Sequence, residues 1–165
     1  MVGRSKFLII REEGASQSEA GMGLLWHTEK IYHNFILEPD WKVHHKADNS
    51  GVFVRFPYRN NGPMIAVNNG YEIQRDDLAM PDGNPIHQTG AIYGFAAASK
   101  QIVSKEAGRW NVFDIHVTGQ KYTVTLNNKI VTEFVGNRSL QGYSGLQNHD
   151  NKSKLSFRNI RIKEI

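Results

Sequence analysis

The C-terminal third of the chain alternates between apolar and polar residues with a period of two. Trp110 to Val117, Tyr122 to Leu126 and Leu155 to Ile162 all follow this pattern, which is typical of strands with one buried and one solvated face. The first two are separated by Thr118 to Lys121, and Asn127-Asn128 follows the second, so tight turns are expected at both places. This part of the chain is therefore predicted to form a meander of antiparallel strands.

A longer alternating segment runs from Tyr32 to His44. One face carries the apolar side chains of Phe35, Leu37, Trp41 and Val43, and the other carries Ile36, Glu38, Asp40, Lys42 and His44. Pro39 interrupts this strand, and proline cannot donate a ladder hydrogen bond, so we expect an edge position or a bulge there.

Further short apolar segments bring the predicted total to about a dozen strands, with no convincing helical period. These segments are Lys6 to Arg11, Gly23 to His27, Gly51 to Pro57, Pro63 to Val67, Gly70 to Asp76 and Gly90 to Ala97. Asp76 to Gln88, with two prolines, is expected to be a long exposed loop. The pattern predicts an all-β fold, an antiparallel sandwich of the jelly-roll type.

Composition limits what this sandwich can contain. The 165 residues suit one domain, 1–165, and no segment is apolar enough for a membrane span. The N-terminus shows no export signal, and the absence of cysteine excludes disulfides, thiol catalysis and cysteinyl metal sites. The net charge of +4 comes from dispersed basic residues, so nucleic acid is not an expected partner.

The strand Tyr71 to Asp76 carries the first candidate for chemistry. Alternation places Glu72, Gln74 and Asp76 on one face, about 7 Å apart in succession, and turns Tyr71 and Ile73 toward the core. Carboxylate and amide groups on a sheet suit the hydroxyl groups of a sugar. An ordinary solvated sheet face is the alternative interpretation.

Arg55 is expected to share a face with Phe53, opposite Val52, Val54 and Phe56. There it would either form a structural salt bridge with Glu72 or line a cleft and stabilise a developing oxyanion.

The seven histidines do not show the spacing of a zinc site. His44 and His45 are adjacent, so on a strand they point to opposite faces. A site that combines His149 with Glu72 and aspartates stays open, because spacing rules cannot detect it.

Several segments taken in order resemble the 3-keto-disaccharide hydrolase domain family, formerly a domain of unknown function, with a concanavalin A-like jelly roll. They are Trp41-Lys42, Asp48 to Arg55, Gly70 to Gln74, Thr89 to Gly94, Trp110-Asn111, Gly145 to His149 and Ser156 to Ile162. The resemblance covers Gly23 to the C-terminus. It implies a concave sheet that faces carbohydrate and a periplasmic or secreted location, although no signal peptide is present in this chain.

The resemblance also implies site residues. Glu72 and Gln74 match the family's Tyr-Glu-Ile-Gln strand, Arg55 matches its Ser-Gly-x-x-x-Arg strand, and His149 matches its Gly-Leu-Gln-(Asp/Asn)-His turn. This chain departs from the family in having Asn148 where Asp is common and Asp150 where Gly follows the histidine. These differences are expected to change a hydrogen-bond partner or a metal contact of His149.

The resulting hypothesis is a hydrolase that acts on 3-keto-glycosides or disaccharides. A ketone at C3 acidifies the proton at C2, so a base can remove it and expel the C1 substituent, after which water adds. The expected catalytic residues are Glu72 as the base, His149 as the proton donor or a metal ligand, and Arg55 as an enolate stabiliser.

Lys42 would assist Arg55 with the enolate, and Gln74 and Asp48 would orient hydroxyl groups, so these three are the expected substrate-binding residues. No cofactor is certain, and a divalent cation (Ca, Mn or Zn) would serve the same end as the arginine. The expected oligomeric state is a monomer or weak homo-oligomer. The alternatives are a non-catalytic carbohydrate-binding module that uses the same concave face, and a structural interaction domain.

Overall fold

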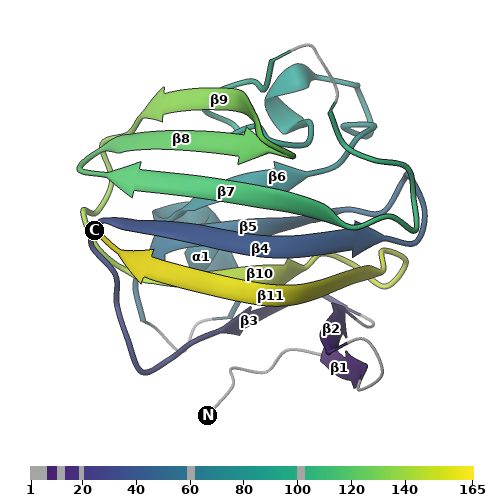
Figure 1. Ribbon diagram of the computed structural model, residues 1–165, viewed down its shortest axis with the longest axis horizontal. Helices are drawn as coiled ribbons and strands as arrows, with labels where there is room; N and C mark the ends of the chain where they lie inside the picture. The colour runs from purple at the N-terminus through teal and green to yellow at the C-terminus, as the bar shows by residue number, and fades with distance from the viewer. Residues whose placement is uncertain (1–6, 11–13, 19–20, 59–61, 100–102) are drawn as a thin grey trace.

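The computed structural model describes residues 7–10, 14–18, 21–58, 62–99 and 103–165, which form two antiparallel sheets packed face to face (Figure 1). The larger sheet has seven strands, in the order β1 (Phe7–Ile10), β2 (Ala15–Ser18), β11 (Leu155–Glu164), β4 (Phe35–Val43), β7 (Asn111–Thr118), β8 (Lys121–Leu126) and β9 (Lys129–Val135). The smaller sheet has four, in the order β3 (Gly23–Trp26), β10 (Tyr143–Asn148), β5 (Ser50–Phe56) and β6 (Tyr71–Arg75). The predicted all-β jelly-roll sandwich is confirmed.

The core lies between the sheets and follows the predicted alternation. Phe35 and Trp41 of β4 and Phe113 of β7 are fully buried there, opposite Val52 and Ile73 of the smaller sheet. Burying a large apolar side chain stabilises the fold by roughly 1.5–3 kcal/mol. The inner faces of the sheets are thus committed to packing, and the outer faces are free to carry chemistry.

Pro39 lies in a central strand, because β4 pairs with β11 on one side and β7 on the other. The pairing of β11 with β4 is irregular between Arg158 and Arg161, opposite Pro39, and Asn159 there has a φ of 48°. The bulge part of the prediction is therefore right and the edge part is wrong. A bulge on the partner strand accommodates the missing N–H of proline.

Two predicted strands are wrong. The segment after Pro63 forms the helix α1 (Met64–Asn69), since the fixed φ of proline suits a helix start and Gly70 ends it. The segment Gly90 to Ala97 forms turns with only isolated bridges at Ile92. None of the helices in the described residues is long and apolar enough to span a membrane.

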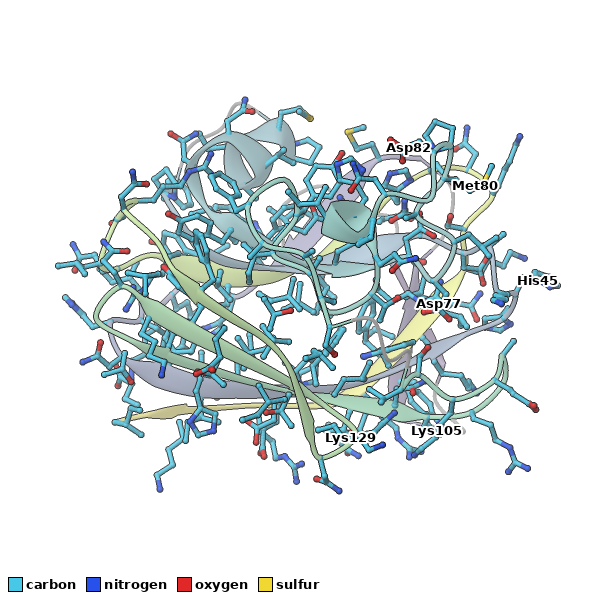
Figure 2. All side chains as sticks on the ribbon, turned by 90° about the horizontal axis from the view of Figure 1, so that it is seen from above. His45, Asp77, Met80, Asp82, Lys105 and Lys129 are labelled. Carbon is cyan, nitrogen blue, oxygen red and sulfur yellow. The ribbon has the colours of Figure 1, made fainter. Side chains whose placement is uncertain are left out.

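Helix α1 and the loop that follows β6 lie on the outer face of the smaller sheet. Figure 2 shows Met80 and Asp82 of this loop on one side of the sandwich, with Lys105 and Lys129 on the opposite side. The loop contains a 3-10 turn, η2 (Pro85–His87). These two connections flank the part of the sheet that carries Glu72.

Candidate functional site

A pocket of about 300 Å³ opens on the outer face of the smaller sheet. This is at the lower end of the range for small-ligand sites. The sheet forms its floor, and α1 and the loop after β6 form its walls. The lining residues are Met22, Asn49, Phe53, Pro63, Met64, Val67, Glu72, Gln74, Asp76, Met80, Pro81, Asp82, His87, Tyr93, Gln147 and His149.

Strand register sets the polar pattern of the floor. On β6 and β5, Glu72 pairs with Phe53 and Gln74 pairs with Gly51. Because side chains two residues apart share a face, both polar residues of β6 point outward while Tyr71 and Ile73 enter the core. The predicted faces of this strand are confirmed.

Glu72 is the most perturbed acid of the floor. Its carboxyl leans across β5 into the space left by the missing side chain of Gly51, and Glu72 is only 7% exposed. Burial raises the pKa of Glu72 to about 8, against a smaller opposing effect of its hydrogen bond with Gln147. The carboxyl is therefore mostly protonated at neutral pH.

Two buried amides flank this carboxyl. The Oε1 atoms of Gln74 and Gln147 have no hydrogen-bond partner among the described residues. The Nε2 of Gln74 donates to Asn49 Oδ1 at 3.3 Å, which fixes that amide. Buried polar atoms are normally paired, so these two oxygens are ready acceptors for ligand hydroxyl groups.

Asp76 has a structural role at the edge of the floor. Its Oδ1 accepts the backbone N–H groups of Leu78 and Ala79, each at 3.0 Å, and its Oδ2 accepts from Met80 N at 3.2 Å. These bonds begin the loop that walls the pocket. In the described part of the chain, no group of three or more His, Asp or Glu side chains could hold a metal ion.

His149 follows the end of β10 and lines the pocket beside Gln147. Its Nδ1 lies 3.0 Å from Asp150 Oδ2, while Asp150 Oδ1 accepts the backbone N–H groups of Lys152 at 2.7 Å and Ser153 at 2.6 Å. Burial acts to raise the pKa of Asp150, but these hydrogen bonds outweigh it and lower the pKa to about 2. Asp150, which departs from the family pattern, is thus a hydrogen-bond partner of His149 in this chain.

The wall adds an aromatic element. His87 of η2 stacks on Tyr93, with ring centroids 4.7 Å apart, and both line the pocket. Apolar rings beside polar groups suit the two chemically distinct faces of a sugar ring.

Arg55 does not line this pocket, which corrects its expected place beside Phe53. Pairing of β5 with β10 shifts at this point, and Arg55 has a φ of 57°, so a bulge turns its side chain inward. The guanidinium is fully buried and donates to the carbonyl oxygens of His33 and Gly119 and to Tyr122 Oη. It holds loops together at one end of the sandwich.

Lys42 and Asp48 also lie away from the pocket. Lys42 is on β4 of the larger sheet, with its Nζ 4.8 Å from the ring centroid of Trp110. Asp48 is buried, and its Oδ2 accepts the backbone N–H groups of His44 at 2.9 Å and His45 at 2.7 Å. Its expected role in orienting hydroxyl groups is replaced by a turn-stabilising one.

The lining residues that the sequence does not predict as site residues include Phe53, His87, Tyr93 and Gln147. Gln147 lies on β10, two residues before His149, which directly follows the strand, so their spacing is a usable signal. His87 and Tyr93 come from connections, for which the sequence offers no periodicity.

The sequence matches the 3-keto-alpha-glucoside-1,2-lyase-like domain family over residues 4–163. The chain belongs to this family. No curated protein matches the chain in a sequence comparison. A solved candidate glycosyl hydrolase from Parabacteroides distasonis ATCC 8503 is 29% identical, with a TM-score of 0.79, over 93% of this chain and 88% of that chain.

More distant solved structures share only the fold with this family member. The carbohydrate-binding module CBM66 from Bacillus subtilis is 13% identical, with a TM-score of 0.70, over 99% of this chain and 94% of that one. The exoplasmic/lumenal domain of VIP36 in its Ca²⁺/Man-bound form is 9% identical, with a TM-score of 0.68, over 98% and 81%. The family match and the 29% identical glycosyl hydrolase candidate support a carbohydrate-related function, and the two more distant structures support the fold.

Proposed function

We propose that the protein cleaves 3-keto-glycosides by elimination across C1 and C2, followed by hydration. The observation that carries this proposal is a pocket in which a buried, protonated carboxyl, Glu72, and a carboxylate-paired imidazole, His149, line the same cavity. Two titratable groups in such different environments are suited to separate acid and base roles. The family's description as 1,2-lyase-like supports the same chemistry.

The reaction balances without an external oxidant or cofactor. A base removes the C2 proton, the electron pair forms an enolate with the C3 ketone, and collapse of the enolate forms the C1–C2 double bond. The C1–O bond breaks at this step, and the departing oxygen takes up a proton. Water then adds its oxygen to C1 and a proton to C2, which leaves a free 3-keto sugar and an alcohol.

The floor supports a sugar-sized, hydroxyl-rich ligand. The free amide oxygens of Gln74 and Gln147 can accept ligand hydroxyl groups, and Tyr93 adds an aromatic ring to the lining of the same pocket. Phe53 and Val67 add apolar lining.

The test uses purified protein and an aryl 3-keto-α-glucoside in D₂O. We expect release of the phenol, a transient enone absorbance and deuterium at C2 of the product. Glu72→Ala and His149→Ala should lose turnover, while the exposed controls Glu133→Gln and His45→Ala should keep it. Tight binding of the glucoside by wild type without C2 exchange would contradict the proposal.

That outcome would favour the second candidate, a carbohydrate-binding module on the same face. One observation supports this alternative: Tyr93 is 39% exposed and stacked on His87, as a sugar platform requires. The two candidates differ in whether the C2 proton exchanges.

A further inference from the structure

The two carboxylate oxygens of Asp150 have different hydrogen-bond partners. The contacts of Oδ1 hold the carboxylate in place and so determine what Oδ2 presents to His149. Oδ1 accepts two backbone N–H groups, from Lys152 and Ser153, so an acceptor is required at that position. Oδ2 faces His149 Nδ1 at 3.0 Å. Because an ionised carboxylate only accepts hydrogen bonds, Nδ1 must carry a hydrogen for this contact to form.

This contact fixes the tautomer of the neutral imidazole. With the hydrogen on Nδ1, the Nε2 atom keeps its lone pair and can accept a proton. A carboxylate that holds an imidazole in this way orients it as a base, as in other catalytic sites. His149 lines the pocket, so its imidazole borders the space for the ligand.

Glu72 is suited to the complementary role. Its carboxyl lies on the floor beside Gln147, and the described lining residues include no Lys or Arg that could compensate an ionised carboxylate or meet an enolate. Arg55 and Lys42, which were expected to do so, lie elsewhere. A carboxylic acid kept neutral by an apolar site can donate its hydrogen to a developing enolate oxygen.

We infer that Asp150 is a positioning residue that makes His149 Nε2 the base for the C2 proton, with Glu72 donating its hydrogen to the C3 ketone oxygen. This inference rests on the proposed function and reverses the roles first expected for Glu72 and His149. The proton taken from C2 by Nε2 passes to the departing C1 oxygen as the C1–O bond breaks. The imidazole then accepts a proton from water during hydration.

The decisive variant is Asp150→Asn, which is isosteric. The Lys152 and Ser153 N–H groups should hold the amide oxygen of the new side chain, so its NH₂ group turns toward His149 Nδ1 and selects the Nε2–H tautomer. Nitrogen-15 NMR of the imidazole should show Nδ1–H in wild type and Nε2–H in the variant. An Nε2–H imidazole in wild type, or no change in the variant, would overturn the inference.

Kinetics give the second readout, with the same aryl 3-keto-α-glucoside. Asp150→Asn should lower kcat by at least about a hundredfold, with a much smaller change in KM, because the tautomer matters only for proton transfer. The matched control is Asp114→Asn, since Asp114 also pairs with a histidine, His116 Nε2 at 2.9 Å, on the outer face of the larger sheet. Equal losses in both variants would contradict a specific role of Asp150.

Glu72 variants separate a hydrogen donor from a base. Glu72→Ala should lower kcat by about a hundredfold to a thousandfold, whereas Glu72→Gln, which still has N–H groups to donate, should keep at least ten times the Ala rate. Equal loss in both variants would identify Glu72 as the base and overturn the inference. If Glu72→Ala and Glu72→Gln lose activity equally but wild type exchanges the C2 proton, the assignment of roles is wrong and the proposed function is supported. If wild type shows no C2 exchange, both the proposed function and the assignment of roles are wrong.

Discussion

The carboxyl of Glu72 occupies the position in which a side chain on Gly51 would begin. An ideal Cβ on Gly51 would lie 2.1 Å from Glu72 Oε1 and 2.6 Å from its Cγ, far inside van der Waals contact. Gly51 and Gln74 are paired across β5 and β6, so the space lies in the middle of the floor. Because Gly51 of β5 has no side chain, the Glu72 carboxyl of β6 can occupy that space.

Gly51→Ala is expected to displace this carboxyl without unfolding the protein, because the three nearest atoms all belong to the flexible side chain of Glu72 and none to the backbone. The pKa of Glu72 should fall toward its ordinary value as the carboxyl moves toward water, and turnover should fall by at least about tenfold. Carboxyl carbon-13 NMR and kcat report the two effects. In a Glu72→Ala background the same glycine substitution should change kcat little, and a further large loss would show that Gly51 acts independently of Glu72.

The stability of the protein should fall as the pH rises from about 4.5 to about 8. The pKa of Glu72 is raised to about 8 in the folded state, so the folded protein binds a proton that the unfolded chain releases above about 4.5. The contribution of Glu72 to the free energy of unfolding is complete below the unfolded-state pKa of about 4.5. It is lost as pH rises through the folded-state pKa of about 8, at up to about 1.4 kcal/mol per pH unit.

Urea unfolding at pH 5, 6.5 and 8 measures this slope. Glu72→Gln should remove most of it and be more stable than wild type at pH 8, while the exposed Glu133→Gln should not. If the free energy of unfolding depends on pH equally in wild type and Glu72→Gln, the Glu72 carboxyl is not buried in its neutral form.

The pH dependence of turnover follows from the same group. If protonated Glu72 donates to the enolate, kcat/KM of the free protein should fall as pH rises through about 8. In Glu72→Gln this alkaline limb should disappear. A rate that climbs through pH 8 in wild type would instead show that the ionised carboxylate is the active form.

Arg55→Met should destabilise the fold and leave the chemistry of the folded protein unchanged. The substitution leaves the partly buried carbonyl oxygens of His33 and Gly119 without their donor, at a cost of about 1–3 kcal/mol. Thermal unfolding and kcat below the transition test this, with the exposed Arg109→Met as the control. A large loss of kcat in folded Arg55→Met would contradict a purely structural role.

The sequence predicts the sheets well because alternation over long strands is a strong signal. Tyr71 and Ile73 point inward and Glu72 and Gln74 outward, as period two requires. Arg55 breaks the same rule, because a bulge inserts one residue into the ladder and reverses every face beyond it. No composition signal marks that bulge.

The walls of the pocket were harder to predict than its floor. The sequence pattern predicts a strand from Pro63, although a helix begins directly after it, and predicts only exposure for the loop after β6. Both errors concern connections, whose path is fixed by long-range contacts such as the hydrogen bonds of Arg138 to Val67 O and of Thr132 to Gly90 O. Such contacts depend on the folded sheet and leave no local pattern.

Under the proposed function, residues on or next to the strands of the floor carry the reactivity. The two connections that form the walls then carry the selectivity, and they are separate segments of the sequence. Acid and base groups reside on or next to strands whose opposite face is locked into the core, so their geometry resists drift. Ala66 of α1 packs against Phe53 and Phe56 of β5, whereas the wall residues Met64 of α1 and Met80 of the loop are exposed and can be substituted without disturbing that packing. Libraries restricted to these two connections are the economical route to variants that accept different leaving groups.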